Sequence, residues 1–294
     1  MILIFYGGHM IDKLDGAKLK EVLSRHGFGF SKSLGQNFLS QERILNNIAN
    51  DADINSEDTV LEIGPGAGTL TRVMAKRAKK VISIEIDRTL LPVLEETLDG
   101  FGVTVINNDF LKLDINKLYE EQLCPGFKLV ANLPYYITTP IIMRVLESGL
   151  PFKSLTILVQ REVAERMAAT PGTPEYGNLT CAVQYYCTTK LQTKLPPAFF
   201  FPPPKVESRV ITLTRRETPP VQVKNEKLFF DLFHAAFNNR RKTYVNNLKS
   251  VFSLDRQACV DLMQKAGLDP EIRGERLSLE AFARICNLME AENK

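Results

Sequence analysis

Short apolar runs alternate with longer amphipathic segments along the first half of the chain. The short runs are rich in Val, Ile and Leu, and they predict strands at residues 59–63, 80–86, 103–107, 127–132 and 154–160. The segments between them, such as TLTRVMAKRAKK and TLLPVLEETL, carry apolar residues at helical spacing. Strand alternating with helix predicts an α/β fold with a mostly parallel, doubly wound sheet.

The pattern changes after the fifth predicted strand. Residues 161–169 predict a helix, and residues 179–195 and 208–216 predict further strands that close the sheet in antiparallel fashion. The sheet domain is therefore expected to end near Arg216. Residues 215–225 contain adjacent prolines and no period, which is typical of a linker.

The last quarter of the chain is helical throughout. Four segments carry apolar residues at helical spacing: 226–239, 242–252, 255–267 and 278–291. We therefore divide the chain into an N-terminal extension (1–17), a sheet domain (18–216) and a small all-helical domain (217–294). Within the extension, we interpret the first nine residues as an upstream start or a cloning remnant, with Met10 as the natural beginning.

Composition narrows the class of protein without identifying it. A chain of 294 residues with 44% hydrophobic content can bury a core, and a net charge of +3 is too mild to argue by itself for a polyanion partner. Five scattered cysteines without a CxxC pair suggest neither a zinc site nor a disulfide framework, so a reducing cytosol fits best. We find no signal peptide and no stretch near the ~18 apolar residues of a membrane span.

Candidate chemistry begins at a glycine-rich turn. Gly64, Gly66 and Gly68 follow the first predicted strand, where glycines let the backbone approach a ligand closely. Glu85 ends the second strand, and an acid there can accept both hydroxyls of a ribose. Asp109 follows the third strand and can accept a hydrogen bond from an adenine amino group. A purely structural turn is the alternative, but three strand ends together predict an adenosine-like ligand.

The glycine pattern distinguishes two cofactor classes. A nicotinamide dinucleotide enzyme is expected to show GxGxxG, whereas this chain has GxGxG with Thr69 at the position of the last glycine. Pro65 and Glu62 are typical of S-adenosylmethionine binders. We therefore favour the methyl donor.

The fourth strand ends in the stretch NLPYYITTP, residues 132–140. An adenine amino group is a poor nucleophile, because its lone pair is delocalised into the ring. If the Asn132 side-chain carbonyl and the main-chain carbonyl near Pro134 accept its hydrogens, the lone pair turns towards the methyl group. The rate enhancement then comes chiefly from holding donor and acceptor in line and from complementary dipoles. Tyr135 offers a face to an extruded base. The alternative is a loop whose tyrosines pack locally.

Four ordered motifs now carry a resemblance. SLGQNFL (33–39), EIGPGAGTLT (62–71), NLPYYITTP (132–140) and FFPPPKVESRV (200–210) resemble those of the KsgA/RsmA family. These are ribosomal RNA adenine N6,N6-dimethyltransferases that modify two adjacent adenosines near the 3′ end of small-subunit rRNA. The resemblance covers the chain from about Lys18 and implies a Rossmann-like class I methyltransferase sheet followed by a small helical domain.

The resemblance also implies roles for individual residues. Donor-site residues would be Asn37, Leu39, Gly64, Gly66, Glu85, Asp109 and Asn132. Asn37 and Leu39 line that site, Gly64 contacts the methionine part, and Asn132 contacts both donor and target amine. Phe200 would stack opposite Tyr135, with Phe199 and Phe201 as alternatives.

Basic residues in the helical domain are candidates for positioning contacts with RNA. They are Arg240, Arg241, Lys242, Lys249, Arg273 and Arg276. A solvated helix face is the alternative explanation. The implied partner is 16S rRNA in the small subunit or its late assembly intermediate, and we expect a cytoplasmic monomer without a metal.

Two other functions remain open at this point. A related branch methylates one adenosine of large-subunit rRNA and confers antibiotic resistance, with nearly identical chemistry. A non-catalytic assembly factor that keeps the fold is the other alternative, although intact Glu85, Asp109, Asn132 and Tyr135 disfavour it.

Overall fold

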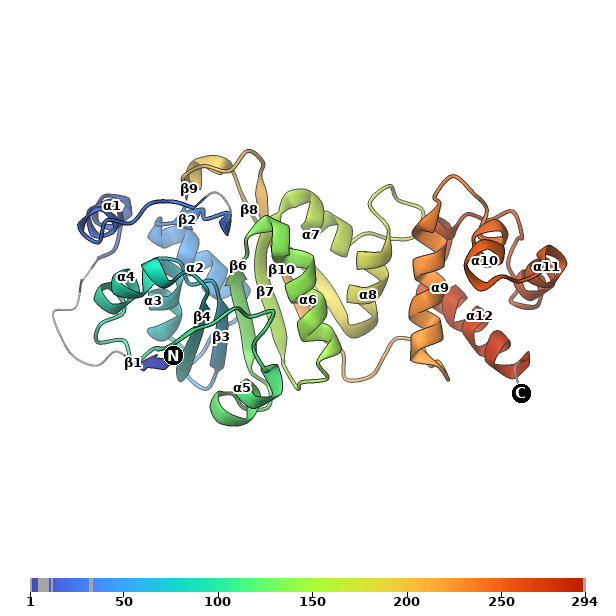
Figure 1. Ribbon diagram of the computed structural model, residues 1–294, viewed down its shortest axis with the longest axis horizontal. Helices are drawn as coiled ribbons and strands as arrows, with labels where there is room; N and C mark the ends of the chain where they lie inside the picture. Colours follow the sequence, from blue (N-terminus) through green and yellow to red (C-terminus); the bar gives the residue numbers. More distant parts are fainter. Residues whose placement is uncertain (1, 5–10, 12, 32–33, 293–294) are drawn as a thin grey trace. The chain divides into compact units, whose positions relative to one another are not determined.

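The computed structural model describes residues 2–4, 11, 13–31 and 34–292 (Figure 1). Our interpretation of Met10 as the natural start falls outside these residues. The chain forms two compact units, one of Met1–Ala164 with Lys190–Arg215 and the other of Glu165–Thr189 with Arg216–Lys294. This division differs from the expected one, because residues 165–189 group with Arg216–Lys294 and the N-terminal extension is not a separate unit.

The first unit is built on a sheet whose central strands are parallel. Its strands are β1 (Ile2–Ile4), β3 (Thr59–Ile63), β4 (Lys80–Glu85), β5 (Thr104–Asn107), β6 (Lys128–Asn132), β7 (Ser154–Gln160), β8 (Cys187–Leu195) and β10 (Ser208–Arg215). Their order is β1-β5-β4-β3-β6-β7-β10-β8, with β3 to β7 parallel and β1 and β10 antiparallel to their neighbours β5 and β7. The predicted doubly wound sheet and its antiparallel closure by β10 are confirmed.

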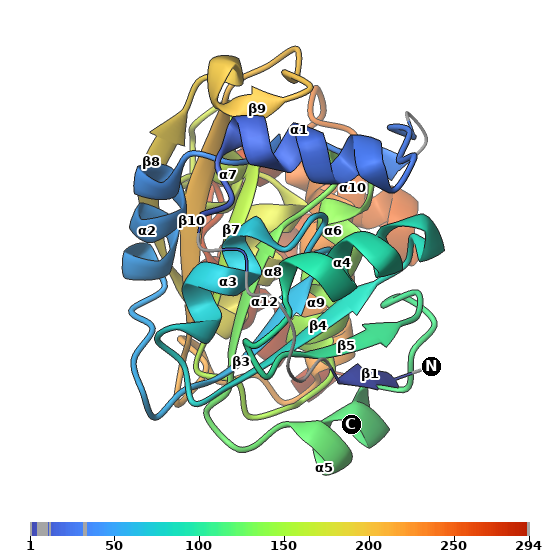
Figure 2. The same ribbon diagram turned by 90° about the vertical axis from the view of Figure 1, so that its left-hand side faces the viewer.

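The parallel strands are joined by helices, as the sequence predicts. The helices of this unit are α1 (Gly16–Arg25), α2 (Glu42–Asp51), α3 (Thr69–Ala75), α4 (Leu91–Thr97), α5 (Ile115–Gln122) and α6 (Thr138–Glu147). Figure 2 shows α3 and α4 beside β4. Gly68 precedes α3 with φ +80°, a left-handed conformation that glycine adopts without strain. The helix therefore begins immediately beyond the glycine turn.

A second, two-stranded sheet joins distant parts of the same unit. β2 (Phe38–Leu39) pairs antiparallel with β9 (Phe200–Phe201), so that Phe38 lies opposite Phe201 and Leu39 opposite Phe200. Two of the motifs that carry the family resemblance are thus neighbours in space.

The second unit is helical. Its helices are α8 (Asn178–Tyr186), α9 (Glu226–Asn238), α10 (Tyr244–Phe252), α11 (Arg256–Lys265) and α12 (Leu279–Glu292), while α7 (Arg161–Met167) spans the boundary between the units. The strand predicted over 179–195 is wrong in its first half, which is α8. Tyr185 packs against Phe229 and Phe230 with ring centroids 5.2 and 5.5 Å apart, so packing on α9 overrides the β-rich composition.

The segment before α9 contains no helix or strand, as expected of a linker, but it is anchored. The Asn287 amide donates to the Gln222 carbonyl at 3.0 Å, and the Asn225 side chain caps α9 at the Leu228 N–H, also at 3.0 Å. Within the described residues, no helix is long and apolar enough to cross a membrane.

Candidate active site

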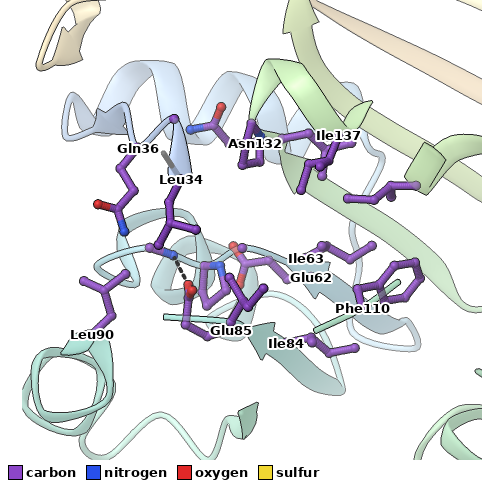
Figure 3. A pocket seen from close by; sticks show the side chains of 18 of the residues that line it. Leu34, Gln36, Glu62, Ile63, Ile84, Glu85, Leu90, Phe110, Asn132 and Ile137 are labelled. Carbon is purple, nitrogen blue, oxygen red and sulfur yellow. Dashed lines mark hydrogen bonds between the residues drawn. The ribbon is translucent and has the colours of Figure 1, made fainter. Parts of the chain in front are cut away.

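A cleft opens at the carboxyl ends of the parallel strands in the first unit (Figure 3). Nine of the ten residues predicted for donor or target binding line it: Asn37, Leu39, Gly64, Gly66, Glu85, Asp109, Asn132, Pro134 and Tyr135. They come from the segment around β2 and from the ends of β3, β4, β5 and β6. Parallel strands deliver these residues to one edge of the sheet, where open α/β folds bind ligands.

The glycine turn combines a packing role with an open surface. A Cβ on Gly66 would lie 2.9 Å from the Phe38 ring, and one on Gly68 would lie 2.9 Å from both Leu98 and Thr97. Gly64 is different, since its nearest neighbour would be a backbone oxygen at 4.0 Å, yet its φ of +70° still favours glycine. The backbone at Gly64 is therefore left open towards the cleft.

Glu85 is a buried carboxylate at the end of β4. One carboxylate oxygen accepts the Asp87 N–H at 2.8 Å and the other accepts the Gly66 N–H at 3.3 Å. Burial raises the pKa of Glu85 to about 7, although these backbone bonds favour the ionised form. A ligand with hydroxyl donors would replace the missing solvation of this carboxylate.

Glu62 lies deeper, at the base of the same cleft. Thr71 and Ser83 donate their hydroxyls to one of its oxygens at 2.6 and 2.7 Å. Burial raises the pKa of Glu62 to about 7 as well. Burial thus raises the pKa values of two carboxyl groups in one cleft to about 7, and of the two only Glu85 accepts a backbone N–H of the glycine turn, that of Gly66.

Two apolar residues of the cleft were not predicted from the sequence. Ile86 is 49% exposed directly after Glu85, and Phe110 directly follows Asp109. The Asp109 carboxylate accepts the Leu111 N–H at 2.9 Å, which orients it at the start of its loop. At two neighbouring strand ends an acid is followed by a large apolar residue. This pattern could have predicted, from the sequence alone, a site for a flat ring.

The orientation of the Asn132 amide is determined by its partner. The Asn132 nitrogen donates to the main-chain carbonyl of Asn37 at 3.0 Å. A carbonyl oxygen only accepts, so the amide must turn its NH₂ group to Asn37. No described residue donates to the remaining Asn132 oxygen, which is therefore an available acceptor in the cleft.

The Pro134 carbonyl is less suited to the predicted acceptor role. It already accepts the Thr138 hydroxyl at 3.1 Å and the Ile137 N–H at 3.2 Å. A carbonyl oxygen has two lone pairs, and both are used here. The Leu133 carbonyl, one residue earlier, has no described donor and is the better candidate, which the sequence analysis missed.

Tyr135 is held in place from across the sheet. Its hydroxyl and the Ser208 hydroxyl are 2.8 Å apart, and Ser208 is fully buried on β10. Burial raises the pKa of Tyr135, so its hydroxyl stays neutral. The ring is thus fixed at both ends, by the backbone and by Ser208.

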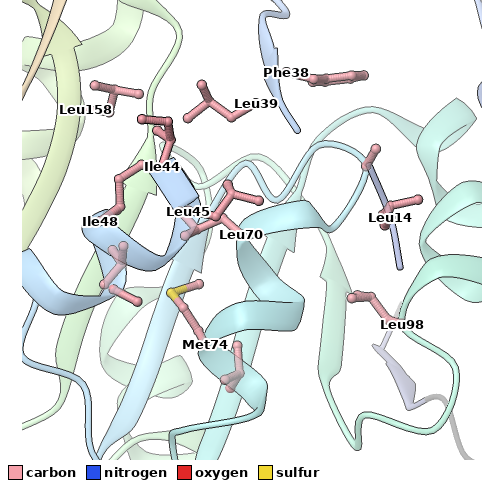
Figure 4. Packing of buried hydrophobic residues seen from close by; sticks show 14 of the residues in the cluster. Leu14, Phe38, Leu39, Ile44, Leu45, Ile48, Leu70, Met74, Leu98 and Leu158 are labelled. Carbon is pink, nitrogen blue, oxygen red and sulfur yellow. The ribbon is translucent and has the colours of Figure 1, made fainter. Parts of the chain in front are cut away.

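Phe200, the tenth predicted residue, does not line the cleft. Its side chain is 6% exposed and belongs to a hydrophobic cluster. Figure 4 shows other members of this cluster, among them Leu39, Leu45, Leu70 and Met74. The neighbouring Phe201 packs its ring edge-to-face on Phe30 at 5.2 Å, beneath the Lys20 ammonium. A stacking role for Phe200 stays a prediction that needs a different arrangement of this segment.

The six basic residues predicted to contact RNA all lie in the second unit and are exposed. Thr243 and Arg273 form a β-bridge, and the Tyr244 N–H donates to the Ile272 carbonyl at 2.8 Å. This pairing brings the segment with Arg241 and Lys242 beside the segment with Arg273 and Arg276. We call these four residues the basic cluster.

Arg240 differs from the basic cluster. Its guanidinium donates to the Pro174 carbonyl at 2.9 Å and to the Tyr176 carbonyl. These bonds tie the end of α9 to the segment before α8, so Arg240 has a structural role whether or not it meets RNA.

Comparison with known proteins identifies the family of this chain. Residues 27–291 match the model of the ribosomal RNA adenine dimethylase family, which is most of the chain. The chain belongs to this family. It is an rRNA adenine dimethyltransferase, and S-adenosylmethionine is its methyl donor.

Relatives and solved structures agree with the assignment. The ribosomal RNA small subunit methyltransferase A of Clostridium botulinum is 51% identical over 267 residues, covering 90% of this chain and 96% of the relative. That of Clostridium perfringens is 49% identical over 281 residues, covering 95% and 98%. A dimethyladenosine transferase from Plasmodium falciparum superposes with a TM-score of 0.74 at 28% identity, covering 87% and 98% of the two chains.

The 23S rRNA methyltransferase ErmE superposes with a TM-score of 0.66 at 28% identity, covering 86% of this chain and all of that one. The Rossmann-like class I methyltransferase fold is therefore confirmed. The cleft also fits the donor chemically, because the buried Glu85 carboxylate needs hydroxyl donors and the open backbone at Gly64 admits a close ligand.

Proposed function

We propose that this chain adds two methyl groups to N6 of each of two adjacent adenosines near the 3′ end of 16S rRNA in the small ribosomal subunit. The observation that carries the proposal is the fixed Asn132 amide, whose acceptor oxygen is available in the donor cleft. The names of the Clostridium relatives support the small subunit as substrate. The large-subunit alternative has weaker support, since the structure so named is only 28% identical.

The donor would be held by residues at three strand ends. S-adenosylmethionine supplies an electrophilic methyl group on a sulfonium. Glu85 would accept the ribose hydroxyls, the backbone at Gly64 would border the methionine part, and Asp109 would accept the adenine amino group. Ile86 and Phe110 would cover the adenine ring, since flat apolar surface favours an aromatic ligand.

The target amine would be activated by two carbonyl acceptors. The Asn132 oxygen and the Leu133 carbonyl would each accept one N6 hydrogen, which localises the nitrogen lone pair. The sulfur–methyl bond would break as the nitrogen–methyl bond forms, leaving a neutral thioether. The methylated amine would then release one proton to solvent, so no general base needs to act before attack. The Tyr135 ring, anchored through Ser208, would stack on the extruded base and restrict its rotation.

Two successive transfers are compatible with this arrangement. After the first transfer the amine retains one N–H, which either carbonyl can still accept. A flat aromatic face tolerates the added methyl group by a small slide of the base. The expected product is therefore N6,N6-dimethyladenosine.

Contacts with RNA outside the target would come from the helical unit. The basic cluster presents cations from two paired segments, and the exposed Lys249 on α10 adds to their charge. Such contacts position the enzyme without reading the sequence. Replacing Arg241 and Lys242 by Ala should weaken subunit binding and reduce its salt dependence, while Lys227→Ala serves as the exposed control on α9.

The proposal also covers the oligomeric state of the enzyme and the assembly state of its substrate. We expect a monomer, because one cleft of one chain is lined by the residues proposed for both donor and target. It would act in the cytoplasm on the small subunit or on its late assembly intermediate. Sedimentation of the purified protein with subunits and with assembly intermediates would distinguish the two substrates.

The decisive experiment uses purified protein, donor and small subunits from cells lacking the enzyme. Digestion and mass spectrometry of the nucleosides should show N6,N6-dimethyladenosine, and large subunits treated in parallel should take up no label. Only monomethyladenosine at long times, or label in large-subunit RNA, would contradict the proposal. Donor binding without any transfer would favour the assembly-factor alternative.

A further inference from the structure

Two neighbouring tyrosines of the 3-10 turn η3 (Tyr135–Ile137) have different surroundings. Tyr135 is tied through its hydroxyl to Ser208. Tyr136 is 58% exposed, and no described residue contacts its hydroxyl by a hydrogen bond. Both line the cleft, so the difference lies in how each ring is held.

Two of the large apolar side chains that are exposed to solvent lie at the cleft. Within the described residues they are Ile86, Tyr136, Val206 and Val251. Ile86 and Tyr136 line the cleft, and Tyr136 is the aromatic member of the set. Exposed apolar surface at the edge of a binding site is typical of a surface that a ligand covers.

The rim of the cleft leaves room for the Tyr136 ring. A Cβ on Gly35 would lie 3.7 Å from the ring and 3.5 Å from Pro134, and Gly35 has φ +59°. These are ordinary contact distances, so glycine is favoured at this position by its positive φ and not by the closeness of the ring. Tyr136 stands at the rim with more than half of its surface open to solvent.

We propose that Tyr136 is a stacking platform for the unpaired base next to the target adenine. This inference rests on the proposed function, in which one adenosine enters the cleft. A base that leaves its stack exposes a face of its neighbour, and that face needs a new partner. Aromatic side chains stack on any base, because every base has a π face. Tyr136 directly follows Tyr135 and lines the same cleft, so its exposed ring is available to the base that flanks the target.

The test uses a fluorescent base that reports stacking directly. Single-stranded oligoribonucleotides carry one adenosine with 2-aminopurine on its 5′ or its 3′ side, and each is titrated with wild-type protein, Tyr136→Phe and Tyr136→Ala. We expect wild type and Tyr136→Phe to quench one of the two probes. Tyr136→Ala should leave it bright and bind about five- to a hundredfold more weakly, with unchanged donor affinity by calorimetry.

The same proteins are then assayed on under-methylated small subunits. Tyr136→Ala should raise KM for subunits more than it lowers kcat, and Tyr136→Phe should match wild type. Equal quenching by wild type and Tyr136→Ala, or no quenching by wild type, would overturn the platform. Ring-dependent quenching without any subunit methylation by wild type would instead support the platform and count against the proposed function.

Discussion

Asn132→Ala is expected to abolish most methyl transfer while leaving the protein folded and able to bind its donor. The change removes the acceptor oxygen that the bond to Asn37 turns into the cleft. Removing one preorganised group aimed at transition-state charge costs about 10²- to 10³-fold in kcat, or ~2.7–4 kcal/mol. The same change deletes one amide–carbonyl bond, which contributes about 1 kcal/mol to stability and shifts Tm by roughly 2–4 °C.

Asn107→Ala is the matched control. Asn107 ends strand β5, which pairs with β4, and its amide donates to the Glu85 carbonyl at 2.8 Å, so it makes the same kind of bond. We expect this variant to lose similar stability in a thermal melt but to keep kcat within a few fold in single-turnover methylation of small subunits. Wild-type turnover by Asn132→Ala, or an equal loss of kcat in both variants, would refute the acceptor role.

Three further changes test other parts of the cleft. The pKa of Glu85, raised to about 7 from 4.5 by burial, predicts that donor affinity rises from pH 6 to pH 8 as the carboxylate ionises; calorimetry should find this slope lost in Glu85→Gln and kept in Glu62→Gln. Stability changes in the opposite sense. Between about pH 4.5 and 7 the unfolded chain ionises this carboxyl while the folded protein keeps it protonated, so the free energy of unfolding falls as the pH rises. Ser208→Ala and Tyr135→Phe should each slow transfer about threefold to tenfold, since each breaks the same hydrogen bond of about 1 kcal/mol. The double variant should be no slower than either single variant, and additive losses would mean that Ser208 acts elsewhere. Gly66→Ala should weaken donor binding and lower Tm, because its methyl group meets the Phe38 ring at 2.9 Å, and an unchanged melt would contradict this packing.

The sheet was predictable because its strands are buried on both faces. β3 is buried along its whole length, so its apolar run and the helical segments beside it specify both element types. The helix α8 was not predictable, since its Val, Thr and Tyr residues favour strands locally. Tertiary contacts, such as those of Tyr185 with α9 more than 40 residues later, offset this local preference.

Some residues of the candidate site could likewise be predicted from the sequence, and others could not. Glu85, Asp109 and Asn132 were predictable because parallel strands place their carboxyl ends at one edge. Ser208 was not predictable, because it lies on a strand distant in the sequence. Leu133 was not predictable either, because every residue has a main-chain carbonyl. The choice between Leu133 and Pro134 depends on which carbonyl is already occupied, and only the hydrogen bonds of the turn reveal that.

The bond between Asn132 and Asn37 has a consequence for synthesis of the chain. Asn37 belongs to the segment that leads into β2, and β2 is paired only when Phe200 and Phe201 have been made. A nascent chain that has completed β6 therefore contains Asn132 but lacks β9, the strand that pairs with β2. We expect methyl transfer only once residue 201 is free to pair, so a chain that ends after β7, with every parallel strand made, should be inactive.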